Sequence, residues 1–153
     1  SGERQHCFVI EAEKGLLLRG SEKELTSAFT NLVYNAINYT PAGKQITIRW
    51  YRTAAGACFE VEDQGIGIEK HHLSRITERF YRVDSGRSRE TGGTGLGLAI
   101  VKRALLRHQA QLDIESELGV GSRFRCQFTR DWVETHLPEA RRTRGSDGQA
   151  VNQ

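Results

Sequence analysis

Gly92, Gly93, Gly95 and Gly97 fall within six residues, immediately before an apolar helical pattern, in the stretch GGTGLGLAIVK at 92–102. Glycine weakens regular structure, so four of them at the mouth of a helix need a reason. The first N–H groups of a helix carry partial positive charge, and glycine leaves the backbone bare for a phosphate chain to lie against them. The stretch therefore predicts a phosphate-binding loop that leads into a helix.

Two other glycine patterns do not fit this stretch. A dinucleotide-binding fingerprint has GxGxxG directly after a strand, whereas here Gly93-x-Gly95-x-Gly97 follows a long polar loop. A P-loop has GxxxxGK[ST], and the residue directly before Lys102 is valine instead of the glycine that this pattern requires. Both of these nucleotide-binding classes are excluded.

The length and composition of the chain are those of one globular domain. The 153 residues are 37% hydrophobic, and no run approaches the roughly 18 apolar residues that a membrane span requires. A net charge of +3 is too small to indicate a nucleic-acid partner. The scattered cysteines, Cys7, Cys58 and Cys126, are expected to be buried free thiols in a reducing compartment. We expect the domain to span residues 1–137 and the polar tail, 138–153, to be disordered.

Hydrophobic periodicity predicts helices and strands in a mixed order. Strands are expected at 6–13, 16–20, 44–52, 57–63, 110–117 and 122–130, and helices at 21–43, 69–80 and 96–109, with a loop at 81–93. Ser21 followed by Glu24 is a capping box for the first helix. This order predicts an α+β fold, a two-layer sandwich in which helices cover one face of a mixed sheet.

Three asparagines lie together on the edge of the apolar face of the first predicted helix. They are Asn31, Asn35 and Asn38, and asparagine is a mediocre helix former. Any one of them alone would be read as a solvated polar residue. As a group, their amide oxygens would suit a Mg²⁺ that already carries phosphate oxygens, since Mg²⁺ takes few ligands from protein.

The stretch EDQGIGI places Asp63 at the end of a predicted strand, followed by Gly65 and Gly67. An ordinary strand-ending turn uses the same residue types. The alternative is a carboxylate on the floor of a cleft, where it accepts a hydrogen bond from an exocyclic amine while the glycines let a flat ring approach.

In this order, the asparagine helix, the DxGxG turn and the GxGLGL loop resemble the GHKL superfamily, and within it the catalytic ATP-binding domain of sensor histidine kinases. NLVYNAINYTP, EDQGIGI, ERFYRVD, GGTGLGLAIVK and GVGSRF are similar to that family's N, G1, F, G2 and last glycine motifs. These motifs cover about residues 5–130. The sequence between these motifs resembles that of the phosphate-regulon sensor kinases.

The resemblance implies a role for each matching residue. Asn35 would bind Mg²⁺, and Asn31 and Arg82 would be catalytic, with Asn31 lining the phosphates and Arg82 reaching the γ-phosphate of ATP. Asp63 would accept from the adenine amino group beside Ser122. The remaining nucleotide-binding residues would be Tyr39, Gly65, Ile66, Gly67, Ile68, Phe80, Gly93, Thr94, Gly95, Leu96, Gly97 and Leu98.

Two positions depart from the family pattern. The family often has lysine where this chain has Asn38, which puts one phosphate contact in doubt. It usually has threonine where this chain has Ser122, which keeps the hydroxyl. His71 and His72 match no motif, and we expect them to be surface residues.

The resemblance implies a protein-histidine kinase domain that binds Mg-ATP and transfers its γ-phosphoryl group. The acceptor histidine would belong to a separate dimerisation domain, and a response regulator would be a further partner. The isolated domain would be a monomer and the cytoplasmic part of a homodimeric inner-membrane sensor.

Two alternatives stay open. An ATP hydrolase of the superfamily would carry glutamate at position 31, where this chain has Asn31, and an amide cannot be a general base. A nucleotide-gated interaction module would transfer nothing.

Overall fold

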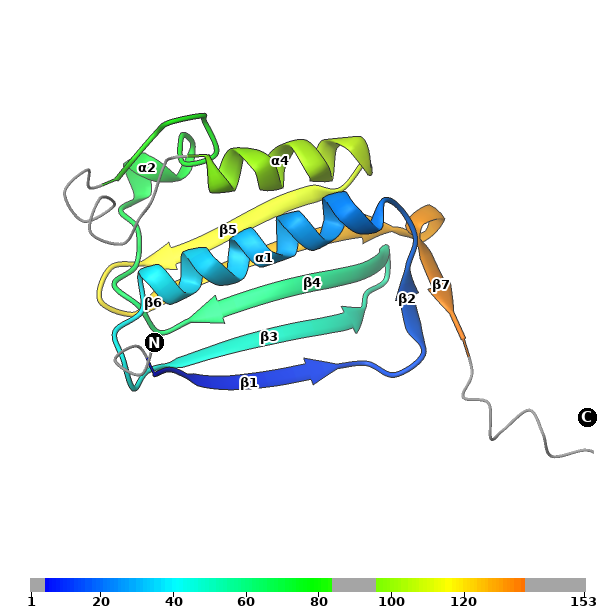
Figure 1. Cartoon of the computed structure of the whole chain (residues 1–153), viewed down its shortest axis with the longest axis horizontal. Helices are drawn as coiled ribbons and strands as arrows, with labels where there is room; N and C mark the ends of the chain where they lie inside the picture. The colour runs from blue at the N-terminus through cyan, green and yellow to red at the C-terminus, as the bar shows by residue number, and fades with distance from the viewer. Residues whose placement is uncertain (1–4, 84–95, 137–153) are drawn as a thin grey trace, which may run out of the picture.

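A five-stranded mixed sheet carries two helices on one of its faces (Figure 1). The structure is a computed structural model that describes residues 5–83 and 96–136. The strand order is β1 (Cys7–Ala12), β3 (Gln45–Arg52), β4 (Gly56–Asp63), β6 (Gly121–Thr129) and β5 (Gln111–Glu117). β1 and β3 are parallel and the other neighbours are antiparallel. With α1 (Glu22–Asn38) and α4 (Gly97–Arg107) on one face, the predicted two-layer α+β fold is confirmed.

The first helix begins as the capping box predicts. The Ser21 side-chain oxygen accepts from the Glu24 backbone N–H at 3.1 Å. The reciprocal partner differs from the prediction, because the Ser21 N–H donates to Nε2 of His108, at the end of α4. The same residue therefore starts α1 and ties it to the helix beside it.

Ser21→Ala is expected to lower the free energy of unfolding by about 1 kcal/mol, since it leaves the Glu24 N–H without its acceptor. Chemical denaturation measures the change. Thr30→Ala, on the exposed face of the same helix, is the matched control and should not destabilise the domain. Equal losses in the two variants would contradict the capping role.

The hydrophobic core lies between the helices and the sheet. Leu32 from α1 and Val101 and Leu105 from α4 pack against Phe124 and Phe128 of β6. The opposite face of the sheet is charged: Arg49 pairs with Glu62 at 2.7 Å, and Glu62 also pairs with Arg123. Only one face of the sheet therefore needs helices to cover it.

The helix predicted at 69–80 is wrong in its extent. The structure has a four-residue helix, α2 (Lys70–Leu73), followed by turns, and Phe80 adopts a positive φ of 68°. Within this stretch Ile76 is the one fully buried residue, so little apolar contact supports a longer helix.

The strand predicted at 16–20 is present, but it belongs to a second, two-stranded sheet that the sequence did not predict. β2 (Leu16–Leu18) pairs antiparallel with β7 (Val133–Thr135), which follows the short 3-10 helix η1 (Arg130–Trp132). Cys7 also differs from prediction: it is exposed on the edge strand β1, whereas Cys58 and Cys126 are buried. The predicted tail, 138–153, and most of the predicted loop lie outside the described residues.

Candidate functional site

The elements that carry most of the predicted site residues share one end of the molecule. The C-terminal ends of α1 and β4, the turn between β5 and β6, and the start of α4 all lie at the left in Figure 1. Helix, sheet and turn each contribute backbone and side chains there. At the end of β4, whose last residue is Asp63, the chain approaches Tyr39 at the end of α1 and Ser122 of β6.

Asp63 is a buried carboxylate, with 6% of the residue exposed. Its Oδ1 accepts from the backbone N–H groups of Gly65 at 2.9 Å and Ser122 at 3.2 Å. Both bonds fall on Oδ1, so neither engages Oδ2. These contacts fix the orientation of the side chain and leave its second oxygen for another donor.

Burial raises the pKa of Asp63 to about 6, and the hydrogen bonds from Gly65 and Ser122 act in the opposite direction. At neutral pH the group is ionised and acts only as an acceptor. An ionised carboxylate away from water is costly unless donors surround it. The position is therefore built at some expense to stability, which is typical of a binding residue.

Asp63→Asn is expected to stabilise the free protein at pH 8 by about 1–2 kcal/mol, because the charged form no longer has to be buried. The pKa is higher in the folded than in the unfolded chain. The wild-type protein therefore loses stability as pH rises from about 4 through about 6. The advantage of Asn should vanish at pH 4, where the carboxyl is protonated. Urea unfolding at both pH values measures it, and a pH-independent difference would contradict this reading.

Two glycines allow the close approach that assembles this end of the fold. A β-carbon at Gly65 would lie 2.2 Å from the Tyr39 carbonyl oxygen and 2.9 Å from Asp63 Oδ1. Gly121 has φ of +144°, and a β-carbon there would lie 2.0 Å from the Asp63 carbonyl oxygen. A side chain at either position would push α1 or β6 away from the end of β4.

Thr40, which the sequence analysis missed, lies next to the carboxylate. It is 5% exposed, and its Oγ1 is buried without a hydrogen-bond partner among the described residues. Oγ1 and Asp63 Oδ1 are both about 3 Å from the same point, the β-carbon position at Gly65 (3.0 and 2.9 Å). Buried hydroxyls are normally hydrogen-bonded, so within the described part of the chain this site has a polar group left for a further partner. In the sequence, only its position between Tyr39 and Pro41 could have indicated that Thr40 belongs to the site.

Ser122 lies beside Asp63, as the resemblance implies. Its Oγ is 2.7 Å from Oγ of Ser116, a second residue that sequence reasoning missed. The Ser116 hydroxyl accepts from the Ile68 N–H at 2.7 Å and donates to the Gly121 carbonyl at 3.1 Å. Ser116 sits in an ordinary alternating strand, so nothing in the sequence singled it out. It links the turn after β4 to the β5–β6 hairpin.

The turn between β4 and α2 borders the candidate site on one side. The Ile66 N–H donates to the Tyr39 carbonyl at 3.1 Å, and its carbonyl accepts from the Gly119 N–H at 2.9 Å. Gly67 has φ of +81°, and a β-carbon there would lie 2.2 Å from the Glu117 carbonyl oxygen. Ile68 is half-buried and packs against the core. The turn is thus held on both sides.

Asn31 touches the start of the second long helix. Its Nδ2 donates to the Ser27 carbonyl at 2.8 Å, which points Oδ1 toward Gly97, where a β-carbon would lie 3.0 Å away. The N-cap residue, Leu96, makes no side-chain capping bond, so no side chain there caps the first N–H groups of α4. Asn35 and Asn38 are half-buried on the same helix as Asn31.

The remaining predicted residues are placed less closely. Phe80 is exposed, with the Arg79 guanidinium 5.3 Å from its ring centre, and Arg82 is half-buried. Leu98 packs against the core. Gly93, Thr94 and Gly95 lie outside the described residues, so their predicted phosphate contacts stay predictions.

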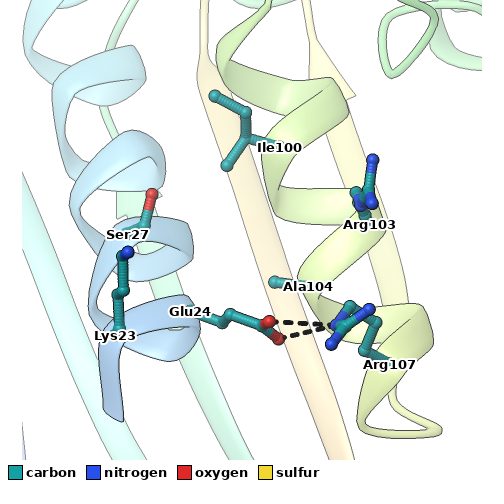
Figure 2. A pocket seen from close by; sticks show the side chains of 7 residues that line it. All are labelled: Lys23, Glu24, Ser27, Ile100, Arg103, Ala104 and Arg107. Carbon is teal, nitrogen blue, oxygen red and sulfur yellow. Dashed lines mark hydrogen bonds and ion pairs between the residues drawn. The ribbon is translucent and has the colours of Figure 1, made fainter. Parts of the chain in front are cut away.

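A pocket of about 380 Å³ lies elsewhere, between the first half of α1 and α4. Figure 2 shows Glu24 reaching Arg107 across it, at 3.0 Å. Its lining comprises Lys23, Glu24, Ser27, Ile100, Arg103, Ala104 and Arg107. None of these is a predicted site residue, and the pocket is separate from Asp63.

Comparison with known proteins places the chain in a family. The family model for histidine kinase-, DNA gyrase B-, and HSP90-like ATPases matches residues 20–131. The chain is 55% identical over 128 residues to the phosphate regulon sensor protein PhoR of Pseudomonas aeruginosa, and 46% identical over 117 residues to that of Haemophilus influenzae. These matches cover 84% and 76% of this chain but only 29% and 27% of the relatives.

Solved structures agree with this assignment. A mycobacterial sensor histidine kinase, MprB, superposes with a TM-score of 0.73 at 28% identity, covering 90% of this chain and 88% of that one. The catalytic domain of histidine kinase ThkA shares the fold, with a TM-score of 0.70 at 22% identity over 82% of this chain and 80% of that one. The family expected from the motifs is confirmed: the chain belongs to the histidine kinase-, DNA gyrase B-, and HSP90-like ATPase family, as a histidine kinase ATP-binding catalytic domain similar to that of PhoR.

Proposed function

We propose that this domain binds Mg-ATP at the end of β4 and transfers the γ-phosphoryl group to a histidine of a separate dimerisation domain. Domains of this family bind ATP. The observation that carries the proposal is the buried Asp63 carboxylate: among the described residues it is held through Oδ1, and the nearby Thr40 hydroxyl has no hydrogen-bond partner there. In the transfer, the bond between the γ-phosphorus and the bridging oxygen breaks, a phosphorus–nitrogen bond forms, and ADP leaves.

The adenine end of the site fits an amine-bearing ring. Asp63 Oδ2 would accept from the exocyclic amine, and the Thr40 hydroxyl would pair with a ring nitrogen or an ordered water. Gly65 and Gly67 keep the wall free of side chains, and Ile66 and Ile68 supply apolar surface. Ser122, tied to Ser116, would support the carboxylate from the hairpin side.

The phosphate end would use α1 and the start of α4. Asn31 and the N–H groups after Leu96 and Gly97 would line the phosphate chain, continuing the contacts proposed for Gly93 through Leu98. Asn35 would bind Mg²⁺ through its amide oxygen. A single neutral oxygen donor fits this ion, because Mg²⁺ is usually held by few protein ligands together with substrate phosphates and water. Tyr39 and Phe80 would border the nucleotide.

Asn35→Ala is expected to weaken ADP binding about tenfold in the presence of Mg²⁺ and by less than about twofold in its absence, because only the metal-linked contact is lost. Calorimetric titration with and without Mg²⁺ measures both. Thr30→Ala, on the exposed face of the same helix, is the control and should not change the Mg²⁺ dependence. Equal losses in the two conditions would rule out a metal ligand at Asn35.

Kinase activity is favoured over ATP hydrolysis by residue 31. A hydrolase of this superfamily would carry a glutamate there to activate water. Asn31 instead has its amide nitrogen bonded to the Ser27 carbonyl, and an amide takes up no proton at neutral pH.

Arg82 would supply positive charge to the γ-phosphoryl during transfer. A nucleotide-gated interaction module is the second candidate, and labelled ATP with an acceptor domain distinguishes it.

The likeness to PhoR supports proposals about the whole protein. The chain spans less than a third of those relatives. We infer that the parent is a homodimeric inner-membrane sensor kinase that controls the response to phosphate and that this domain faces the cytoplasm as a monomeric unit. Its partners would be the kinase's own dimerisation and phosphoacceptor domain and a response regulator.

A further inference from the structure

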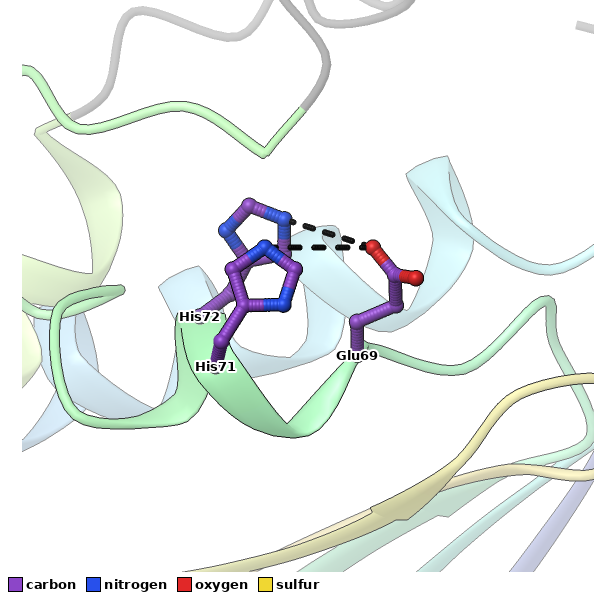
Figure 3. A group of neighbouring side chains, drawn as sticks. All are labelled: Glu69, His71 and His72. Atoms are coloured by element: carbon purple, nitrogen blue, oxygen red, sulfur yellow. Dashed lines mark ion pairs between the residues drawn. The ribbon is translucent and has the colours of Figure 1, made fainter.

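Three side chains of metal-ligating type converge at α2, next to the turn that carries Ile68 but outside the set of proposed nucleotide-binding residues. They are Glu69, His71 and His72, and their ligand atoms lie within 4.8 Å of one another (Figure 3). Glu69 Oε1 is 3.9 Å from His71 Nε2 and 3.8 Å from His72 Nε2. Figure 3 shows both rings turned toward the same carboxylate oxygen. None of these residues has a role in the proposed phosphotransfer.

His72 is held in the orientation that a metal ligand needs. Its Nδ1 is hydrogen-bonded to the Tyr81 hydroxyl, and its side chain is only 14% exposed. The Arg75 guanidinium lies 4.7 Å from the Tyr81 ring centre and covers that ring. With Nδ1 engaged, Nε2 is the free nitrogen, and it faces Glu69. A hydrogen bond on the second ring nitrogen is the usual support of a metal-bound histidine.

The two flanking ligands can close the remaining gap. Zn²⁺ bonds of about 2.0–2.1 Å in a tetrahedral site place ligand atoms roughly 3.3–3.4 Å apart. The two separations that involve Glu69, 3.8 and 3.9 Å, are about half an ångström wider, and the two histidines offer ligand atoms within 4.8 Å of each other, with ring centres 4.0 Å apart. The side chains of His71 and Glu69 are 69% and 52% exposed, so small rotations can bring them in without moving the core.

We propose that Glu69, His71 and His72 form a binding site for Zn²⁺ or a similar divalent transition metal. The ligands would be Glu69 Oε1 and the Nε2 atoms of the two histidines, with water in the fourth position. Two imidazoles and one carboxylate are a known donor set for Zn²⁺, whereas Mg²⁺ prefers oxygen ligands only. The site therefore differs in chemistry, as well as in residues, from the proposed Mg²⁺ ligand Asn35.

Co²⁺ and Zn²⁺ titrations of the full chain test this proposal. Cys7→Ser is used as the background, because Cys7 is an exposed thiol that would itself bind Zn²⁺. At pH 7.5 and without nucleotide, Co²⁺ should bind with one equivalent and give the visible absorption of a low-coordinate nitrogen and oxygen site. Zn²⁺ should displace it. His71→Gln and His72→Gln should each weaken Co²⁺ and Zn²⁺ binding at least tenfold.

Two further variants separate ligation from general effects. His136→Gln removes an exposed histidine outside the cluster and should leave both affinities unchanged. Tyr81→Phe keeps all three ligands but releases Nδ1 of His72, and should weaken binding several-fold. Circular dichroism of each metal-free variant checks that it folds. Unchanged affinity in both cluster variants, or an equal loss in His136→Gln, would overturn the proposal.

Discussion

Asp63→Asn is expected to weaken ATP binding at least tenfold while GTP binding changes little. The wild-type carboxylate would accept from the exocyclic amine of adenine, and guanine presents a carbonyl at that position. A hydrogen bond to a charged acceptor in a buried site contributes roughly 1.5–3 kcal/mol, and 1.4 kcal/mol corresponds to a tenfold change in affinity. The variant should therefore bind ATP and GTP with a much smaller difference in affinity than the wild-type protein does.

Competitive displacement of a fluorescent ADP analogue by ATP and by GTP measures this preference. Glu62→Gln is the matched control: it removes the neighbouring carboxylate, whose side chain pairs with Arg49 and Arg123 on the open face of the sheet. It should leave both affinities unchanged. An unchanged ATP/GTP ratio in Asp63→Asn would refute the adenine contact. The expected gain in stability at pH 8 shows separately that the variant is folded.

Arg82→Ala is expected to reduce phosphotransfer to the acceptor histidine about 100-fold or more, while ADP affinity changes less than about threefold. The charge of Arg82 is best used on the γ-phosphoryl as negative charge redistributes in the transition state. ADP has no γ-phosphate, so its binding should not depend on this residue. Single-turnover transfer and ADP calorimetry measure the two effects.

Arg79→Ala is the control for this prediction. Arg79 is an exposed arginine three positions away, lying over the exposed Phe80 ring. Its loss removes the same charge from the same segment and should change transfer less than about threefold. If ADP binding by Arg82→Ala falls as much as its transfer rate, Arg82 stabilises the bound ground state and the proposed role is wrong.

Sequence reasoning succeeded where one local pattern determines one local structure. The hydroxyl of Ser21 sits three residues before the N–H that it caps, and the structure has this bond. Period-two alternation predicted the central strands β3 and β4, and Asp63 stands at the end of β4, as predicted. The glycines at 65 and 97 each have a close protein neighbour in the fold, while their contacts with adenine and phosphate stay predictions.

It failed where the structure depends on contacts between distant segments. β2 pairs with β7 more than 110 residues later, and nothing in either three-residue strand specifies the other. The Thr40 hydroxyl, which has no partner among the described residues, could not be predicted because only the fold brings it and Asp63 together at Gly65. The segment after Glu69 has helix-compatible residues, but only Ile76 of this stretch is buried, so little apolar contact supports the helix beyond Leu73. The asparagine stripe and Arg82 stay predictions, since their roles concern groups that the chain itself does not contain.

The measurement that tests the central claim most directly is transfer of label from γ-labelled ATP to the phosphoacceptor domain of the parent kinase. With Mg²⁺ present, label should appear on that domain, be lost in acid and persist in base, as a phosphorus–nitrogen bond requires. Replacement of the acceptor histidine should abolish it, and Arg82→Ala should nearly do so. ATP that binds but leaves the acceptor unlabelled, whether it stays intact or is released as inorganic phosphate, would contradict the assignment as a histidine kinase.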